Sequence, residues 1–308
     1  MQWRKLGIVF RPDTARPWSR SHAMLPTPLA MEDRGVIRVF YTGCDEQGRG
    51  RPSWVDVDLE DPRRVVGAGT HPLLDVGEPG CFDDNGAVAT SVVRARDGRL
   101  FMYYVGFELG VNVRYRLLTG LAVSDDGGDT FARHATTPIL ERSPEELLFR
   151  CGPYVLDGED GFRMWYVSGS RWTEVDGKAM PEYRIVEATS SDGIAWPRAG
   201  RTCIDITDPD EHGFGRPWVV HEGGRYRMYY SVRRRSLRAY RMGFAESADG
   251  REWNRDDARM NLGAGPERYD DAAIMYAATI EAAGRTWCFY NGNDFGREGF
   301  ALAVREQA

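Results

Sequence analysis

The sequence of 308 residues is poor in cysteine, and this scarcity excludes several protein classes. Its five cysteines are far apart and odd in number, and no C-x-x-C pair typical of a zinc or redox site occurs among them. We therefore expect free thiols rather than a disulfide framework. No cluster of oxygen ligands or cofactor-binding motif stands out either, so no cofactor is expected and no metal site is assigned, while a bound metal in the central channel stays open. The cysteines are Cys44, Cys81, Cys151, Cys203 and Cys288.

A long apolar run and an excess of positive charge are also missing. Without a stretch of about 18 apolar residues, no membrane span is expected. The segment Met1–Lys5 leads into a predicted strand without a signal region, which favours the cytoplasm. Lys and Arg number 40 against 46 Asp and Glu, which argues against nucleic acid because non-specific binding depends on neutralising phosphates. A small molecule or glycan is the expected partner, and the oligomeric state stays open.

What the sequence does contain is an aromatic doublet that recurs about every 60 residues. A repeat of this length with several short strands is typical of a β-propeller. Five repeats predict an all-β, five-bladed propeller forming one domain over residues 1–308, with blades at about 18–74, 75–143, 144–205, 206–265 and 266–308. The last blade lacks an outer strand, which residues 3–10 are predicted to supply. The doublets are Phe40-Tyr41, Tyr103-Tyr104, Trp165-Tyr166, Tyr229-Tyr230 and Phe289-Tyr290.

A second repeat follows the third predicted strand of blades two, three and four. It reads Ser124–Phe131, Ser190–Trp196 and Ser247–Trp253, and it resembles the Asp-box hairpin of sialidase-type propellers. In such a hairpin the Asp side chain caps the turn, Gly adopts a positive φ and the aromatic ring packs beneath. These aspartates are therefore predicted to be structural.

Polar residues precede the apolar run of each predicted inner strand, where all blades would converge. Burial of an unpaired charge is costly, so these residues should pair with one another, contact water or bind a ligand. Because neighbours on a strand point to opposite faces, Asp84 is predicted to face the pocket and Asp83 to brace the strand entry. Aligned on the doublets, the positions are Ser21-His22, Asp84-Asn85, Arg150-Cys151, Gly215-Arg216 and Asp270-Asp271.

Two interpretations of these positions stay open. Arg150 and Arg216 could neutralise Asp84 and Asp271 in a purely structural polar plug. Alternatively, carboxylates and arginines bind sugar oxygens while aromatic rings stack on apolar sugar faces. For the second interpretation the substrate-binding candidates are Arg150, Arg216, Asn85, Asp270, Tyr276, Trp172 and Tyr115.

One dense basic run, Arg233–Arg235 with Arg238 and Arg241, lies in a predicted hairpin loop. A run of like charges is usually a solvated surface, and this is the first interpretation. A site for an anionic ligand is the alternative.

Five segments carry a resemblance to a known group of proteins: Phe82–Gly86, Gly120–Ser124, Met164–Gly169, Gly215–Val219 and Tyr290–Gly296. The whole chain resembles the five-bladed propellers of the arabinanase, levansucrase and invertase type, and in particular bacterial glycosidase-like proteins. The resemblance implies carboxylates at the inner-strand starts of the first three blades, one acting as base or nucleophile and one as acid.

Only Asp84 matches this pattern cleanly. The position in blade one holds Ser21-His22, the position in blade three holds Arg150-Cys151, and Ala272 follows Asp271 where the nearest relatives carry an acid. The carboxylate constellation of an ordinary hydrolase is therefore incomplete.

We expect a glycosidase-like enzyme that acts on a glycosyl or polyhydroxylated small molecule by carboxylate acid/base chemistry. Asp84 would be base or nucleophile and Asp271 the acid, with His22 assisting because its pKa lies near neutrality. Two alternatives remain. One is a non-catalytic carbohydrate-binding propeller, and the other is a cyclase or lyase of secondary metabolism that holds an anionic substrate with arginines.

Overall fold

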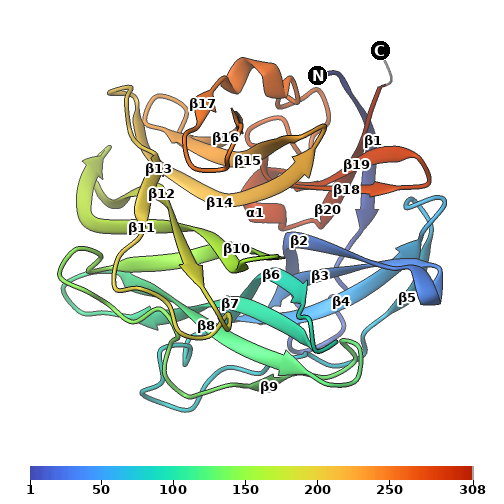
Figure 1. Cartoon of the computed structure of the whole chain (residues 1–308), viewed down its shortest axis with the longest axis horizontal. Coiled ribbons are helices and arrows are strands. Elements are labelled where there is room, and N and C mark those ends of the chain that lie inside the picture. The colour runs from blue at the N-terminus through green and yellow to red at the C-terminus, as the bar shows by residue number, and fades with distance from the viewer. Residues whose placement is uncertain (307–308) are drawn as a thin grey trace.

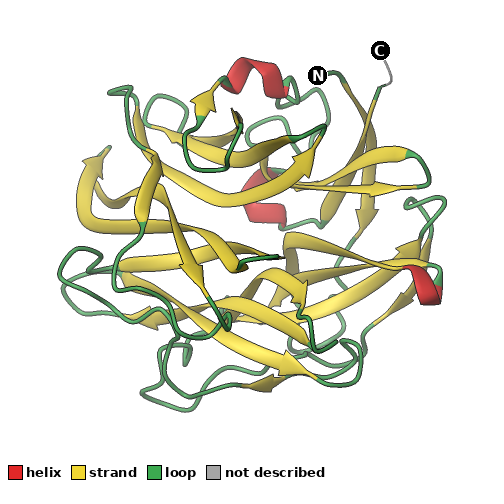
Figure 2. Cartoon of the chain, viewed as in Figure 1, coloured by secondary structure: helices red, strands yellow, loops and turns green. Residues whose placement is uncertain are grey.

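The computed structural model of the chain describes residues 1–306 and consists almost entirely of β-strands (Figure 2). Its helical elements are the 3₁₀ turns η1 (Glu32–Arg34) and η2 (Asp257–Met260) and the short helix α1 (Asn293–Gly296). Within the described part of the chain, no helix is long and apolar enough to cross a membrane.

Antiparallel pairing sorts the strands into five groups that follow the order of the chain and lie around a common centre (Figure 1). Group one is β2 (Ser21–Met31), β3 (Val36–Cys44), β4 (Gly50–Asp58) and β5 (Val65–Ala68). Group two is β6 (Ala87–Arg94), β7 (Leu100–Leu109), β8 (Tyr115–Ser124) and β9 (Ala132–Arg133). Group three is β10 (Phe149–Gly158), β11 (Gly161–Val175), β12 (Lys178–Ser190) and β13 (Arg201–Ile204).

Group four is β14 (Glu211–Glu222), β15 (Arg225–Arg234), β16 (Ala239–Ser247) and β17 (Asn254–Arg255). Group five is β18 (Met275–Ala282), β19 (Arg285–Asn291) and β20 (Phe300–Arg305), joined by β1 (Trp3–Phe10). Only short parallel contacts link groups two, three and four into one sheet: two residue pairs between β8 and β10, and one between β12 and β14. Side-chain packing therefore carries most of the contact between groups.

The first strand of the chain closes the last group. β1 pairs antiparallel with β20 from Trp3 opposite Arg305 to Phe10 opposite Phe300, as the sequence predicted. This pairing covers an edge of β20 that would otherwise offer free N–H and C=O groups. The first and last strands of the chain, β1 and β20, consequently lie side by side (Figure 1).

The aromatic doublets form the cores between groups. Each doublet lies on the second strand of its group, and its rings rank among the most deeply buried side chains of the molecule. Tyr229, for example, packs with Trp218 of its own group against Ala278 and Cys288 of group five. Full burial of one large apolar side chain contributes about 1.5–3 kcal/mol, so the repeated doublets supply much of the folding free energy.

The predicted Asp-containing turns are present in groups two, three and four. Asp192 accepts hydrogen bonds from the backbone N–H groups of Ile194 and Ala195, at 2.8 and 2.9 Å, and Gly193 has a φ of 73°. Trp196 then packs edge-on to Tyr103 of the preceding group, with ring centroids 6.4 Å apart. In group four, Asp249 accepts the equivalent hydrogen bonds from the Arg251 and Glu252 N–H groups, and these lower its pKa to about 2. The structural role predicted for these aspartates is therefore confirmed.

Each inner strand carries a β-bulge, and the bulges were not predicted. The pairing register shifts at corresponding places in β2, β6, β10, β14 and β18. Positive φ values occur there at Leu25, Gly152, Arg216 and Tyr276. A bulge inserts an extra residue and re-aims the side chains around it. Arg216 is thus the counterpart of Tyr276 and not of Asp271, which corrects the alignment of inner-strand positions made from the doublets alone.

Candidate functional site

Arg216 occupies the interior of the molecule and joins four of the five groups. Its guanidinium donates to the carbonyls of Pro26, Tyr276 and Thr90 at 2.9, 3.3 and 3.2 Å, and to the Thr27 hydroxyl at 2.9 Å. It is only 2 % exposed, and no carboxylate lies among its partners. Burial without a counter-charge lowers its pKa to about 9. Arg216 therefore stabilises the convergence of the inner strands, and only its Nε–H, which is buried, lacks a partner among the described residues.

The first residue of each Asp-Asp pair is buried and bound by the protein. The Asp83 carboxylate accepts hydrogen bonds from the Tyr104 hydroxyl at 3.1 Å and from Arg133 at 2.8 Å. Asp270, which is fully buried, likewise accepts from the Tyr290 hydroxyl at 3.2 Å and from Lys5 at 2.6 Å. In both cases the tyrosine belongs to the doublet and the cation to the outermost strand of the group. These carboxylates connect the inner and outer edges of a group, and each keeps one buried oxygen without a partner among the described residues.

Groups three and four contain buried glutamates at related positions, Glu146 and Glu211, which the sequence analysis did not single out. Glu146 accepts hydrogen bonds from the Tyr166 hydroxyl and pairs with Arg150 at 2.5 Å. Arg150 also donates to the Glu141 and Pro197 carbonyls, at 2.8 Å each. Its guanidinium is therefore held within group three, where it is only 3 % exposed.

The signal for these glutamates was in the sequence. Asp83, Glu146 and Asp270 all precede the doublet tyrosine that they bind by about 20 residues. Glu211 lies at the same offset from Tyr230 in group four, where it pairs with Arg255 of β17. Aligning the five repeats on the acid about 20 residues before each doublet tyrosine would have identified Glu146 and Glu211. The sequence analysis instead aligned the charged residues nearest the apolar run.

The second residue of each Asp-Asp pair is less buried than the first. Asp84 is half-buried in the turn before β6, where one oxygen accepts from the Gly80 N–H at 3.0 Å. Asp271 is exposed in the turn before β18, where one oxygen accepts from the Asn293 side chain at 2.7 Å. The two residues occupy corresponding positions, and each keeps a carboxylate oxygen without a hydrogen-bond donor among the described residues. Chemistry with a carboxylate requires such a free oxygen.

His22 lies between groups one and five with strained backbone geometry. Its φ is 66°, its N–H donates to the Arg297 carbonyl at 3.1 Å, and its Nδ1 lies 2.7 Å from the Ser21 hydroxyl. Burial and the nearby Arg297 guanidinium lower its pKa, while the backbone and carboxylate of Asp294 act in the opposite direction. The ring is therefore neutral at pH 7 and able to accept a proton.

The segment Asn291–Phe295 connects these candidates. The Asn291 amide binds the backbone of Ala23 and Leu25 in group one, at 2.9 and 2.8 Å. Asn293 accepts from the N–H groups of Ala272 and Ala273 in addition to holding Asp271. Asp294 and Phe295 both have positive φ, at 49° and 59°. This part of the predicted resemblance motif therefore positions His22 and Asp271 around α1.

Aromatic side chains surround the same region. Trp172 lies 5.4 Å from Tyr115 and 5.6 Å from Phe149, measured between ring centroids, and Tyr183 lies 5.3 Å from Phe149. Asn85 joins the Asp84 turn to this cluster because its N–H donates to the carbonyl of Phe107, whose ring is 6.2 Å from Tyr115. The structure thus brings Trp172, Tyr115 and the Asp84-Asn85 turn together.

A second set of rings lies on the side of groups four and five. Tyr240 is 5.8 Å from Tyr276 and 6.3 Å from Phe295, and Ala273 beside Asp271 packs with both tyrosines. Arg233 lies over the rings of Tyr240 and Phe295, at 5.1 and 6.0 Å. We call Tyr115, Trp172, Tyr183, Arg233, Tyr240, Tyr276 and Phe295 the mouth cluster.

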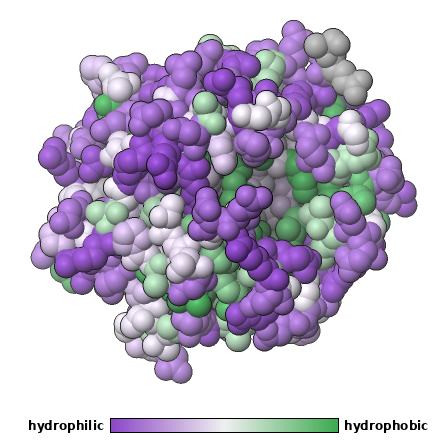
Figure 3. Space-filling view, in the orientation of Figure 1, coloured by the Kyte–Doolittle hydropathy of each residue, from purple (hydrophilic) through white to green (hydrophobic). Residues whose placement is uncertain are grey.

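One face of the molecule is hollowed near its centre, with apolar residues in the depth and hydrophilic residues around the rim (Figure 3). Aromatic walls with a few polar groups are typical of a small-molecule site. Among residues 1–306, no group of three or more His, Cys, Asp and Glu side chains could hold a metal ion.

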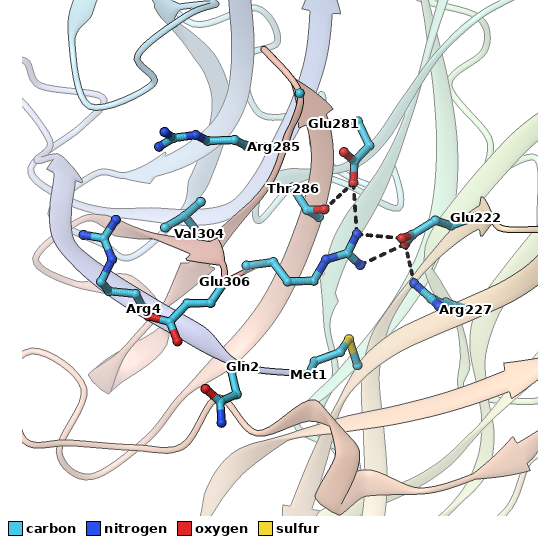
Figure 4. A pocket seen from close by; sticks show the side chains of 12 residues that line it. Met1, Gln2, Arg4, Glu222, Arg227, Glu281, Arg285, Thr286, Val304 and Glu306 are labelled. Carbon is cyan, nitrogen blue, oxygen red and sulfur yellow. Dashed lines mark hydrogen bonds and ion pairs between the residues drawn. The ribbon is translucent and has the colours of Figure 1, made fainter. Parts of the chain in front are cut away.

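A separate groove lies where β1 meets β20 and the hairpin loops of groups four and five (Figure 4). It has a volume of about 1190 Å³, and Arg305 crosses it to pair with Glu222 at 2.6 Å and Glu281 at 3.6 Å. Glu222 pairs in turn with Arg227 at 2.5 Å. Arg305, Glu222, Glu281 and Arg227 therefore satisfy one another across this groove.

Comparison with solved structures identifies the fold. A glycoside hydrolase superimposes with a TM-score of 0.77 at 20% identity, covering 99% of this chain and 92% of that one. A thermostable family-43 glycoside hydrolase gives a TM-score of 0.68 at 14% identity, covering 96% and 92%. An endo-arabinase from Bacteroides thetaiotaomicron gives 0.63 at 14% identity, covering 95% and 97%. The chain therefore has the propeller-type fold of arabinanase-like glycoside hydrolases, as the sequence resemblance indicated.

No protein-family model matches the chain. A full-length relative exists in Mycobacterium tuberculosis, the uncharacterized protein Rv1502, which is 36% identical over 309 residues. The alignment covers 99% of this chain and all of the relative. The chain thus belongs to the same protein family as Rv1502.

Proposed function

We propose that this protein is a glycosidase-like enzyme that acts on a glycosyl or similarly polyhydroxylated small molecule at the mouth cluster. Asp84 serves as base or nucleophile, Asp271 as acid, and His22 as an auxiliary proton carrier. Trp172, Tyr115 and Tyr276 stack against the substrate, and Asn85 binds its hydroxyls. We also propose that the five strand groups are the five blades of one propeller domain.

One observation carries this proposal: the second carboxylate of each Asp-Asp pair is left with a free oxygen beside aromatic rings. Asp83 and Asp270 are buried and bound through one oxygen, and their other oxygen is enclosed by the protein, whereas Asp84 is half-buried and Asp271 is exposed. Glycoside hydrolysis needs two carboxyl groups, one protonated and one ionised, and aromatic rings bind the apolar faces of sugars. The likeness of the fold to glycoside hydrolases supports the same assignment.

The test is the replacement of Asp84 by Asn, which keeps the shape of the side chain and removes its basicity. Turnover on a panel of p-nitrophenyl glycosides and oligosaccharides is expected to fall about 10²–10⁴-fold, as for the loss of a general acid or base. The melting temperature should stay within about 2 °C, since the carboxylate accepts only one hydrogen bond from the described residues.

Asp125→Asn is the matched control, because Asp125 is exposed in a turn of the same group. It should leave turnover unchanged. Full activity in the Asp84→Asn variant would remove Asp84 from the mechanism.

A non-catalytic carbohydrate-binding protein is the second candidate, and the arrangement in group three favours it. Arg150 occupies the position of that group where the resemblance implies an acid, and it is held by Glu146 and the Glu141 carbonyl. Calorimetry with the same oligosaccharides distinguishes the two, because this candidate requires binding without turnover by the wild-type protein.

A further inference from the structure

Four of the five arginines in the basic run at the β15–β16 hairpin are bound by the protein. Arg234 lies 3.4 Å from Asp208, and Arg235 donates to the Thr173 hydroxyl and the Glu174 carbonyl at 3.2 and 3.1 Å. Arg238 pairs with Asp176 at 2.7 Å, and Arg241 donates to the carbonyls of Tyr240 and Ala272 at 2.9 Å each. These four side chains therefore tie the hairpin to its neighbours.

Arg233 is the exception. It lies near the end of β15, paired with Gly213 on one side and Tyr240 on the other, and its side chain is half-buried in the mouth cluster. Within residues 1–306, its guanidinium forms no ion pair and donates no hydrogen bond; its close neighbours are the Tyr240 and Phe295 rings. An arginine carries five N–H donors, so a large hydrogen-bonding capacity is unused here.

The tyrosines near Arg233 also have hydrogen-bonding groups that the protein does not use. Tyr240 lies opposite Arg233 in the strand pairing, Tyr183 lies opposite Gly213 on its other side, and Tyr276 lies 5.8 Å from Tyr240. Tyr115 lies 6.0 Å from the Phe149 ring, which Tyr183 also contacts. None of their hydroxyls is hydrogen-bonded to a described residue, in contrast to Tyr104, Tyr166, Tyr230 and Tyr290 of the doublets. Burial raises the pKa of Tyr183 and Tyr276 well above the ordinary value, so these hydroxyls remain protonated donors.

A partly desolvated cation among unused hydroxyl donors is stabilised most by an anion that accepts from all of them. Carboxylate and phosphate groups accept two parallel hydrogen bonds from a guanidinium, and such charge-assisted bonds are about twice as strong as neutral ones. We infer that Arg233, assisted by the four tyrosines, binds an anionic group on the substrate, either a carboxylate or a phosphate. The inference builds on the proposed function, because it specifies the chemical class of the sugar that the mouth cluster recognises.

The experiment measures binding rather than turnover, so its result does not depend on the catalytic roles of Asp84 and Asp271. Calorimetry compares glucuronate, glucose 6-phosphate and glucose on the wild-type protein at low ionic strength. At least one of the two anionic sugars is expected to bind about 10-fold or more tightly than glucose, since a hydrogen bond to a charged group contributes about 1.5–3 kcal/mol.

Arg233→Gln should weaken binding of that anionic sugar about 10- to 100-fold and change the affinity for glucose less than about 2-fold. Arg238→Gln is the matched control on the same hairpin and should preserve the preference. Arg233→Lys keeps the charge without the planar fork and should recover part of the affinity.

The outcomes separate the two proposals. Equal affinity of the wild-type protein for all three sugars overturns the anion site, whether or not the variants fold. Retention of the preference in Arg233→Gln also overturns it. Anion binding that depends on Arg233, in a protein that hydrolyses no glycoside, supports the site and refutes the glycosidase. Whichever anionic sugar binds more tightly identifies the group as carboxylate or phosphate.

Discussion

Arg216 and Arg233 lie on neighbouring strands of group four, β14 and β15, yet the protein uses them in opposite ways. Arg216 is almost fully buried and directs its hydrogen bonds to backbone carbonyls and a hydroxyl of three other groups. Arg233 lies beside the ring of Tyr240 and near other tyrosines of the mouth cluster, but its guanidinium donates to no described residue. The contrast teaches that burial of a cation alone does not mark a binding site. The decisive feature is whether the protein itself satisfies the donors.

Burial also separates the two residues of each Asp-Asp pair. Asp83 and Asp270 are buried and bound by a doublet tyrosine and a cation, and the oxygen that these donors leave free is enclosed by the protein. Asp84 is half-buried and Asp271 exposed, and each retains a free oxygen. An interior region of satisfied charges thus holds the groups together, and a neighbouring region of unsatisfied donors and acceptors is available to a ligand.

The largest expected effect is on stability, from Arg216→Met. The substitution leaves three buried carbonyls and a hydroxyl without their donor, and each unsatisfied group is costly. We expect a loss of about 3–5 kcal/mol in the free energy of unfolding, measured by urea denaturation. Arg233→Met is the matched comparison and should change that free energy by less than about 1 kcal/mol. Equal losses in the two variants would erase the proposed distinction between the arginines.

A smaller effect is expected from the Asp270 and Asp271 neighbours. Asp270→Asn leaves the Lys5 ammonium, whose side chain is only 18 % exposed, without its counter-charge. The free energy of unfolding should fall by about 2–4 kcal/mol, because breaking a largely buried ion pair strands one charge. Asp271→Asn should change it by less than about 0.5 kcal/mol, since Asp271 is exposed. A stable Asp270→Asn variant would show that β1 is held by its strand pairing alone.

The smallest effect concerns pH and sharpens the placement of His22. Its folded-state pKa is below the ordinary value of 6.5, so the unfolded chain binds the proton more tightly. The contribution of His22 is therefore complete above about pH 6.5 and is lost as the pH falls below it. His22→Gln should make the melting temperature less sensitive to acid between pH 7.5 and 5. Identical pH profiles for the variant and the wild type would contradict the lowered pKa.

Much of the fold could be predicted because its signals are local and repeated. The doublets mark buried second strands, and the Asp-containing turns are closed by hydrogen bonds over two to four residues. The equivalence of Asp84 and Asp271 also followed from the sequence, since both come just after a buried aspartate and before an apolar run.

The roles of Arg150, Arg216 and Arg233 could not be predicted. A β-bulge in each inner strand shifts the register, so alignment on the doublets compared residues that occupy different places. Arg150 is neutralised by Glu146 of its own group and Arg216 is bound by other groups, and sequence alone does not show which acceptors surround a side chain. Arg233 was hidden in a run that resembles a solvated loop.

The sequence by itself determined the all-β repeat architecture, the strand that closes it and the location of the paired aspartates. Periodic burial and turn chemistry depend on residues close together in the chain, so they can be read from it. Only the tertiary structure decided which charged side chains are paired or hydrogen-bonded within the protein and which have no such partner among the described residues. That outcome depends on contacts such as Arg216 with Thr27, Lys5 with Asp270 and Arg233 with Phe295, which join residues far apart in the sequence.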